Sequence, residues 1–185
     1  MEIAVKKKKF TVDDYYLLAE AGIISYDDRV ELINGEIIEM SPHNPPHSVC
    51  ISRLTMLFAS QLVGKAIVSV QLSLTLDNYN EPEPDLVLYK HRDDFYEGER
   101  SKPENALLVV EVANTTIKYD RGVKRELYAK AGIPEYWIVD VKNQLLERYT
   151  LPEKGQFSRK EILDKKTSAK LSQLDFTVEL KKVFG

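Results

Sequence analysis

Two acidic residues stand where the sequence predicts buried strands. Asp85 follows a proline and opens the apolar run from Leu86 to Tyr89, and Glu111 directly follows the apolar run from Leu107 to Val110. Short branched runs of this kind are typical of buried strands. A carboxylate there is costly to bury unless it meets a cation, a metal or strong hydrogen-bond donors. Two such acids on neighbouring strands can hold one Mg²⁺, with water and a backbone carbonyl completing its shell. Each acid alone is weak evidence, because an acid at the end of a strand is structural more often than not.

Basic residues follow Glu111 closely in the chain, namely Lys118, Arg121, Lys124 and Arg125. A helix is predicted from about Asp120 to Ala131, because a glycine and then a proline follow it. In that helix Asp120, Lys124 and Tyr128 are spaced four residues apart and share one face. We expect this face to border the core near the strand that carries Glu111. A surface Asp–Lys pair, worth only about tenths of a kcal/mol, is the structural alternative.

The elements that must position these residues follow from apolar patterns and turn signals. A second apolar strand, from Glu135 to Val139, follows the helix and ends in Asp140, which predicts a right-handed strand–helix–strand unit. Asn34-Gly35 lies between two strand-like runs and predicts a hairpin, whose acids Glu31, Glu36 and Glu39 would by default face solvent.

Further segments complete the predicted secondary structure. A helix with its N-cap at Thr11 is expected near the start, and a second helix from Pro46 to Leu62 should bury a stripe that includes Val49. The remaining expectations are a strand from Ala66 to Leu76, an antiparallel pair at Gln144–Leu151 and Phe157–Ile162, and a closing strand or short helix between Leu171 and Phe184.

Composition narrows the class of protein. The 185 residues, with 43% apolar and 30% charged side chains, suit one globular domain, residues 1–185. No apolar run approaches the roughly 18 residues of a membrane span, and no signal peptide is recognisable, so we expect no membrane association and a cytoplasmic location. The net charge of −3 argues against a protein that coats nucleic acid.

Several familiar sites are excluded by the motifs that the chain lacks. It has no P-loop and no G-x-S-x-G elbow. The single cysteine, Cys50, excludes an intrachain disulfide and a cysteine-based zinc finger, and we expect it to be buried and inert. His43 and His47 are four residues apart, but two prolines between them exclude a helical zinc pair.

Four segments together resemble a known family. They are RVELINGEIIEMSPHNPPHS, PEPDLVLY, VVEVANTT and YDRGVKRELYAKAGIPEYWIVD. Over roughly Phe10 to Tyr149 the chain resembles the Uma-type family of restriction-endonuclease-like proteins, in the PD-(D/E)XK nuclease superfamily. The resemblance implies an α/β (α+β) fold with a central mixed β-sheet flanked by helices; with the hairpin at Asn34-Gly35, this is the expected architecture.

The resemblance also implies a site. It places a Mg²⁺-dependent phosphodiesterase centre, with Mn²⁺ as a possible substitute, at the metal ligands Asp85 and Glu111. The usual lysine, two residues after the strand acid, is replaced here by Ala113. In the family the lysine has moved to the following helix, which corresponds to Lys124, with Lys118 as the fallback. Positioning of Lys124 is assigned to Asp120 and Tyr128; Glu31, His47 and Gln71 are supporting residues without a firm role.

The function implied is hydrolysis of DNA phosphodiester bonds, with RNA not excluded. A homodimer is expected by analogy, because cutting both strands of a duplex favours two-fold symmetry, and the hairpin from Val30 to Met40 could supply the contact. The alternative is a nuclease fold that has lost catalysis and binds nucleic acid or protein. Convergence of Asp85, Glu111 and Lys124 on one metal would favour the enzyme; a Glu111–Lys124 salt bridge without a metal cavity would favour the binding module.

Overall fold

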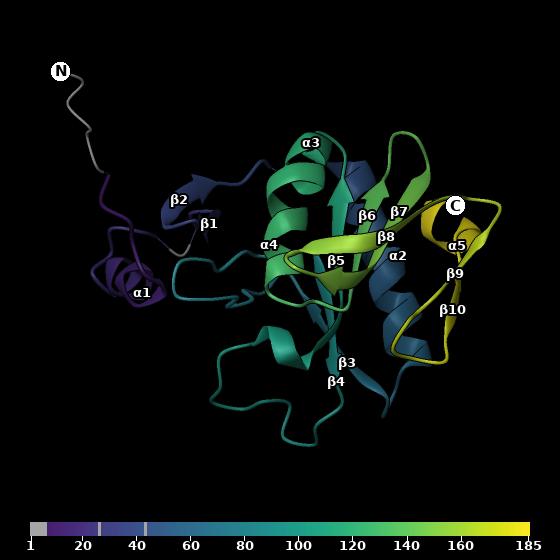
Figure 1. Ribbon diagram of the computed structural model, residues 1–185, viewed down its shortest axis with the longest axis horizontal. Helices are drawn as coiled ribbons and strands as arrows, with labels where there is room; N and C mark the ends of the chain where they lie inside the picture. The colour runs from purple at the N-terminus through teal and green to yellow at the C-terminus, as the bar shows by residue number, and fades with distance from the viewer. Residues whose placement is uncertain (1–6, 26, 43) are drawn as a thin grey trace.

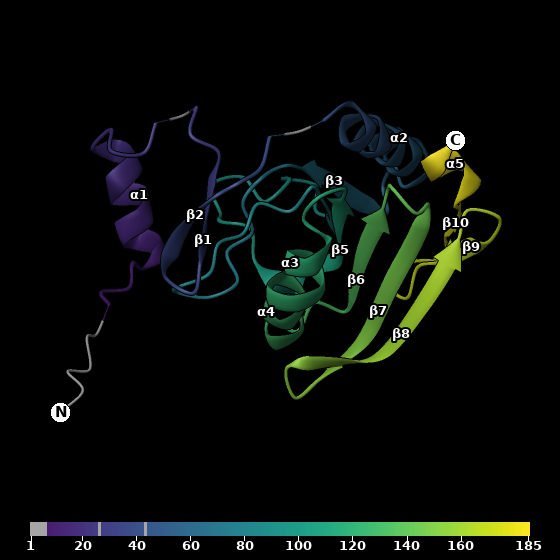
Figure 2. The same cartoon turned by 90° about the horizontal axis from the view of Figure 1, so that it is seen from above.

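The protein is built on a six-stranded mixed β-sheet with helices on both faces (Figures 1 and 2). The computed structural model describes residues 7–25, 27–42 and 44–185, so His43 lies outside the described residues. The strand order is β3-β4-β5-β6-β7-β8, and only β5 and β6 are parallel. The strand bounds are β3 Ala66–Val70, β4 Leu86–Lys90, β5 Ala106–Ala113, β6 Glu135–Asp140, β7 Leu145–Glu153 and β8 Gln156–Asp164. The predicted central mixed sheet is confirmed.

The other elements are short and gather at the two ends of the sheet. At the N-terminal end lie α1 and the β1–β2 hairpin, and at the C-terminal end lie the β9–β10 pair and α5 (Figure 1). Their bounds are α1 Val12–Glu20, β1 Val30–Ile33, β2 Glu36–Glu39, β9 Ser168–Lys170, β10 Thr177–Glu179 and α5 Lys181–Phe184. The longest helix is α2, Pro45–Gln61, and η1, Pro103–Asn105, is a single 3₁₀ turn. Among the residues described, no helix is long and apolar enough to cross a membrane.

Local sequence signals account for the start of the chain. Thr11 caps α1 in a reciprocal arrangement with Asp14, in which each side chain accepts a hydrogen bond from the other residue's backbone N–H. The turn between β1 and β2 places Asn34 and Gly35 at φ values of 52° and 75°, as an Asn-Gly hairpin requires. The predicted hairpin is confirmed.

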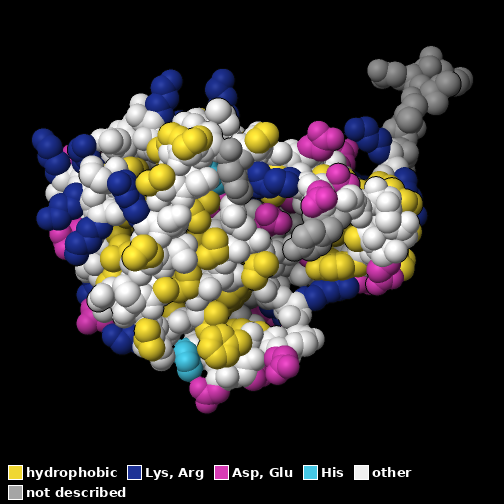
Figure 3. Space-filling view, turned by 180° about the vertical axis from the view of Figure 1, so that it is seen from behind, with side chains coloured by type: hydrophobic (Ala, Val, Ile, Leu, Met, Phe, Trp, Pro, Cys, Tyr) yellow, Lys and Arg dark blue, Asp and Glu magenta, His cyan; other side chains and the backbone are white. Residues whose placement is uncertain are grey.

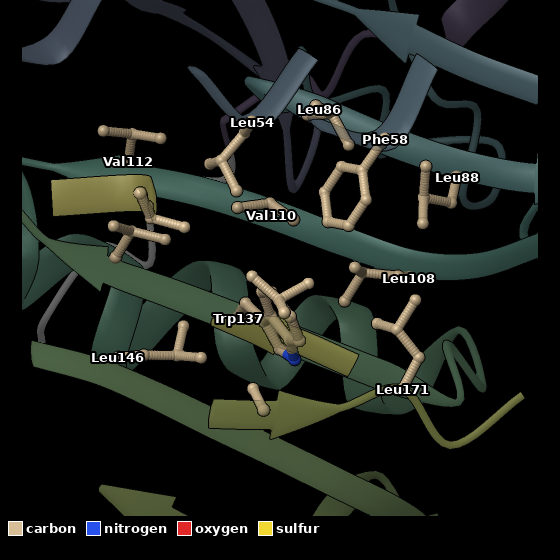
Figure 4. Packing of buried hydrophobic residues seen from close by; sticks show 14 of the residues in the cluster. Leu54, Phe58, Leu86, Leu88, Leu108, Val110, Val112, Trp137, Leu146 and Leu171 are labelled. Atoms are coloured by element: carbon tan, nitrogen blue, oxygen red, sulfur yellow. The ribbon is translucent and has the colours of Figure 1, made fainter. Parts of the chain in front are cut away.

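Two hydrophobic cores hold the layers together. On one face of the sheet, Leu54 and Phe58 of α2 pack against leucines and valines of β4 and β5 and against Trp137 of β6 (Figure 4). On the other face Tyr128 packs with tyrosines and aliphatic residues of β4, β5 and β6. Because β5 has alternating side chains in each core, it is buried along its whole length.

The helical connection between β5 and β6 is not a regular α-helix. It consists of α3, Ile117–Tyr119, a π-helical turn at Asp120–Lys124, and α4, Arg125–Lys130. In the π turn the N–H of Arg125 donates to the carbonyl of Asp120, five residues earlier. The helical segment therefore begins before Asp120, the predicted start, and its middle is wider than predicted.

Three expectations about individual positions are wrong. Val49 lies on the outer face of α2 and is 48% exposed, because the buried stripe of that helix runs through Cys50, Leu54 and Phe58. The strand expected to reach Leu76 ends at Val70, because Gln71 adopts a left-handed backbone with φ 51°. Glu31 faces inward and is buried, whereas solvent exposure is the default for a hairpin acid.

Candidate active site

A cavity of about 300 Å³ lies where the β1–β2 hairpin meets the start of β4 and the end of β5. Seven of the eight residues singled out in the sequence line it: Glu31, His47, Gln71, Asp85, Glu111, Asp120 and Lys124. Tyr128 is fully buried behind Glu111. These residues come from separate segments of the chain, and the fold brings all of them together.

The antiparallel pairing of β4 and β5 brings the two predicted metal ligands side by side. Leu86 pairs with Val110, so the preceding Asp85 lies beside the next residue, Glu111. Asp85 is held by its neighbours: its Oδ2 accepts the backbone N–H of Val112 at 2.8 Å and lies 3.1 Å from His47 Nε2. The Asp85 carboxylate therefore has a fixed orientation just before the start of β4.

Lys124 bridges two buried carboxylates. Its Nζ lies 2.8 Å from Oε2 of Glu31 and 3.0 Å from Oε1 of Glu111. Glu31 also accepts the backbone N–H of Glu83 at 3.2 Å. Tyr128 donates its hydroxyl proton to Oε1 of Glu111 at 2.7 Å, so its direct contact is with that acid and any effect on Lys124 passes through it.

Burial governs the electrostatics of these groups. Burial raises the pKa of Glu111 to about 8, although Lys124 opposes the shift. Burial likewise raises the pKa of Asp120 to about 6, although a 2.7 Å hydrogen bond from the Thr116 hydroxyl acts to lower that pKa. Burial acts to lower the pKa of Lys124, but the carboxylates of Glu111 and Glu31 outweigh it and raise that pKa above its ordinary value. Lys124 is therefore a permanent cation among several acids.

The donor set suits a hard divalent cation. Asp85 and Glu111 present carboxylate oxygens to the cavity, and Glu31, Glu83 and Asp120 add further negative charge to its lining. Within the described part of the chain, no three His, Cys, Asp or Glu side chains are grouped as a ready-made metal site. Mg²⁺ does not need such a group, because it binds through one or two carboxylates and keeps several waters. The residues therefore fit Mg²⁺ better than zinc, which takes nitrogen or sulfur ligands.

Position 113, where the usual motif has its lysine, belongs to the hydrophobic core. Ala113 is 1% exposed and packs in the cluster that contains Tyr128. Lys124 instead brings its ammonium to Glu111 from the neighbouring π turn. The fallback residue, Lys118, is exposed and does not line the cavity. The salt bridge that would mark a binding module is thus present, but it borders a cavity rather than replacing one.

The residues singled out in the sequence do not include every residue that lines the cavity; Arg29, Glu83 and Tyr119 are among those missed. Glu83 could have been found, because in the extended segment EPEPD it lies two residues before Asp85 and such residues share a side. No local signal marks Tyr119 or Arg29. The hydroxyl of Tyr119 is buried and, among the described residues, lacks a hydrogen-bond partner.

Comparisons with known proteins agree with this fold. A family model described as "Uma2: Putative restriction endonuclease" matches residues 12–180, which extends the predicted resemblance beyond Tyr149. A crystal structure of "a putative nuclease belonging to DUF820 from Anabaena variabilis ATCC 29413" is similar with a TM-score of 0.70 and 18% identity, covering 95% of this chain and 97% of that chain. At this identity the likeness concerns the fold. No match was found among curated proteins.

Proposed function

The chain belongs to the Uma2 family of restriction-endonuclease-like proteins, and from this premise we propose that it is a divalent-metal-dependent endonuclease acting on DNA. The observation that carries the proposal is the convergence of Asp85, Glu111 and Lys124 on one cavity. The family and the fold support a nuclease; the metal, the residue roles and the DNA substrate are our proposal. A cytoplasmic location stays a prediction that fits such a substrate.

Asp85 and Glu111 would hold Mg²⁺, or Mn²⁺ in its place. Such an ion, when bound, polarises phosphoryl oxygens and lowers the pKa of a coordinated water. The protein's part is to keep both carboxylates fixed. The Val112 N–H and His47 hold Asp85, and Tyr128 holds Glu111, so little reorganisation is needed when the cation enters.

Lys124 supplies the positive charge that the missing lysine at position 113 would otherwise provide. Its ammonium is fixed by Glu31 and Glu111 before substrate arrives. A preorganised, buried cation stabilises charge that develops on phosphoryl oxygens and orients the attacking water. Glu31 thereby gains a role as the residue that positions Lys124 from the side opposite Glu111, and Asp120 adds negative charge that keeps the lysine protonated.

Calorimetry of Mg²⁺ and Mn²⁺ binding tests the ligand assignment. Asp85→Asn and Glu111→Gln should each abolish binding, because each removes one of two charged ligands. Asp175→Asn, at an exposed acid far from the cavity lining, is the matched control and should bind as the wild type does. Titrations should be repeated with DNA present, since phosphate oxygens complete many Mg²⁺ sites. Binding that neither site variant changes would remove the assignment.

The second candidate is a nuclease fold that binds nucleic acid or protein without cutting. The observation in its favour is the ion pair of Lys124 with Glu111, which occupies both groups without a metal. DNA binding that needs no divalent cation, with no cleavage in Mg²⁺ or Mn²⁺, would support this reading. A homodimer and an RNA substrate stay open predictions, and light scattering of the purified chain measures the former.

A further inference from the structure

The residues to which we assign catalysis lie deep in a small, half-open cavity. Asp85, Glu111 and Lys124 are only 8%, 5% and 5% exposed. From this geometry we infer that the site accepts an unpaired DNA strand, or an unpaired end, and discriminates against intact duplex. The inference rests on the proposed function and names the substrate form that this site would take.

The size of the cavity carries the first step. The cavity has a volume of about 300 Å³ and is half open to solvent. A double helix, whose major groove alone is roughly 12 Å wide, is too wide to enter it, and Asp85 and Glu111 are buried below its rim. A single nucleotide is far smaller than a duplex, and cavities of about this volume hold small ligands in other proteins. Enzymes with recessed active sites reach a target nucleotide by taking it out of the duplex or by acting on single strands.

The wall that narrows the site is firmly attached. Leu32 of β1 exchanges backbone hydrogen bonds with Glu81, and the N–H of Gly35 donates to the carbonyl of Tyr79. Leu32 is fully buried, and Glu31 forms the ion pair with Lys124. Lifting the hairpin to admit a duplex would break these contacts, including the pair that positions the lysine. The hairpin is thus a fixed wall of the site.

The lining matches the two ends of a nucleotide. Its floor carries the carboxylates and Lys124, and its outer wall carries the apolar side chains of Ile38, Met40 and Pro42. Tyr119 also lines the cavity, with its buried hydroxyl unpartnered among the described residues. Apolar and aromatic walls take an unstacked base, while the polar floor takes its phosphate.

The charge around the cavity disfavours a duplex. Of its described lining residues, Arg29 and Lys124 are the only Lys or Arg, against six acids, namely Glu31, Glu39, Glu83, Asp85, Glu111 and Asp120. Duplex binding depends on neutralising many phosphates with basic side chains. On the face in Figure 3, Lys and Arg gather most densely at the left edge of the view, and the centre is largely hydrophobic and uncharged. This face offers no continuous basic track.

Fluorescence anisotropy tests the inference without catalysis. The probes are a labelled oligodeoxynucleotide of about 12 nucleotides, within the usual range of single-strand sites, and the same strand annealed to its complement, both in chelator at one fixed low salt concentration. We expect the single strand to bind at least about tenfold more tightly, the equivalent of one stacked base. Equal or tighter duplex binding, or no binding of either probe, would overturn the inference.

A plugging variant locates the binding. Ser41 is exposed and lines the cavity, so Ser41→Trp should block it and weaken single-strand binding about tenfold, again the size of one stacked base. Ser60→Trp is the matched control, because Ser60 is exposed near the far end of α2, about 20 Å along the helix from His47. Unchanged binding by Ser41→Trp, with its thermal unfolding intact, would place the strand elsewhere and sink the inference.

A cleavage assay distinguishes failure of this inference from failure of the proposed function. In Mg²⁺ or Mn²⁺, the single strand and the unpaired arms of a forked duplex should be cut about tenfold faster than the paired stem, and Asp85→Asn should cut none of them. Duplex cut as fast as single strand would overturn the inference and leave the nuclease standing. Preferential single-strand binding without any cleavage would support the inference and overturn the proposed nuclease activity. A site that takes one strand at a time has no chemical need for the two-fold dimer expected for duplex cutting.

Discussion

Replacing Lys124 with methionine should destabilise the protein severely. The ammonium lies 2.8 Å and 3.0 Å from two carboxylates, and all three side chains are at least nine-tenths buried. Methionine keeps most of the volume, so the change removes the charge and leaves Glu31 and Glu111 without their shared cation.

The magnitude follows from the two contacts. Where both acids are ionised, each contact is worth about 5–6 kcal/mol of Coulomb attraction at an effective dielectric constant of about 20. Against their sum stands the desolvation of the ammonium, which costs several kcal/mol. The balance is consistent with the loss of about 3–5 kcal/mol that accompanies removal of one partner from a buried ion pair.

The loss should grow as the pH rises through about 8. Burial raises the pKa of Glu111 to about 8 even with Lys124 present, and without the lysine it moves higher. An acid with a raised pKa in the folded state contributes stability below its unfolded pKa, and that contribution is lost as pH rises through its folded pKa. Below pH 8 Glu111 is mostly protonated in both proteins and the loss reflects Glu31. Above it, only the wild type can ionise Glu111 beside a cation.

Urea unfolding in chelator, at pH 6 and pH 9, measures this prediction. The single tryptophan, Trp137, is fully buried with its ring centroid 6.3 Å from that of Phe58, so its fluorescence reports loss of the core. Lys130→Met is the matched control in the same helical segment. Lys130 pairs with Glu126 on the surface, and such pairs are worth about 0.3–0.5 kcal/mol.

A neutral triple variant isolates the cause. Combining Lys124→Met with Glu31→Gln and Glu111→Gln removes all three charges and should recover most of the lost stability, because uncharged groups of similar shape often replace a buried ion cluster at little cost. A loss at pH 9 no larger than that of Lys130→Met would refute the reasoning. So would a triple variant that is no more stable than the single one.

Three further outcomes are expected. Burial raises the pKa of the Cys50 thiol to about 12, so a thiol reagent at pH 8 should label it only after unfolding; prompt labelling of the folded protein would contradict this. Glu135 is fully buried and accepts a 2.7 Å bond from Arg148, so Glu135→Ala should lower the unfolding free energy by about 3–5 kcal/mol; a loss below about 1 kcal/mol in urea would contradict that estimate. Gly35 has φ +75°, and a Cβ at this position would lie 2.7 Å from Lys9 Cβ. Gly35→Ala should therefore lower the melting temperature by several degrees, consistent with about 1–3 kcal/mol of strain. A calorimetric scan that shows no shift in melting temperature would contradict this prediction.

The parts of the fold that depend on local pattern were predictable. The strand ending in Glu111, the following helix and the strand from Glu135 form one continuous unit, so their apolar runs and stop signals indicate their order. The Asn34-Gly35 turn specifies its own backbone. From the same pattern, Lys124 could be placed near Glu111, because a short connection returns the helix across its own strand.

The parts of the fold that depend on tertiary packing could not be predicted from the sequence. Glu31 faces Lys124 rather than solvent because of where the hairpin docks on the rest of the fold. The residues of the hairpin alone do not indicate that docking position. Val49 looks like a core residue by type, yet α2 turns it outward. Gln71 ends its strand through a left-handed backbone that an ordinary glutamine rarely adopts. The shape of the cavity is a property of all these segments together.

The π turn at Asp120–Lys124 amounts to one surplus residue in an otherwise regular helix. Each helical residue turns the chain by about 100°. A chain lacking one residue in this turn, such as Gly122, could close an ordinary α-helix and would then carry Lys124 around to a different side of it. The ammonium to which we assign a catalytic role would be withdrawn from the site, although every side chain of the site remained in the sequence. Among relatives, the length of this connection would therefore separate competent from silent sites more reliably than a count of acids and lysines.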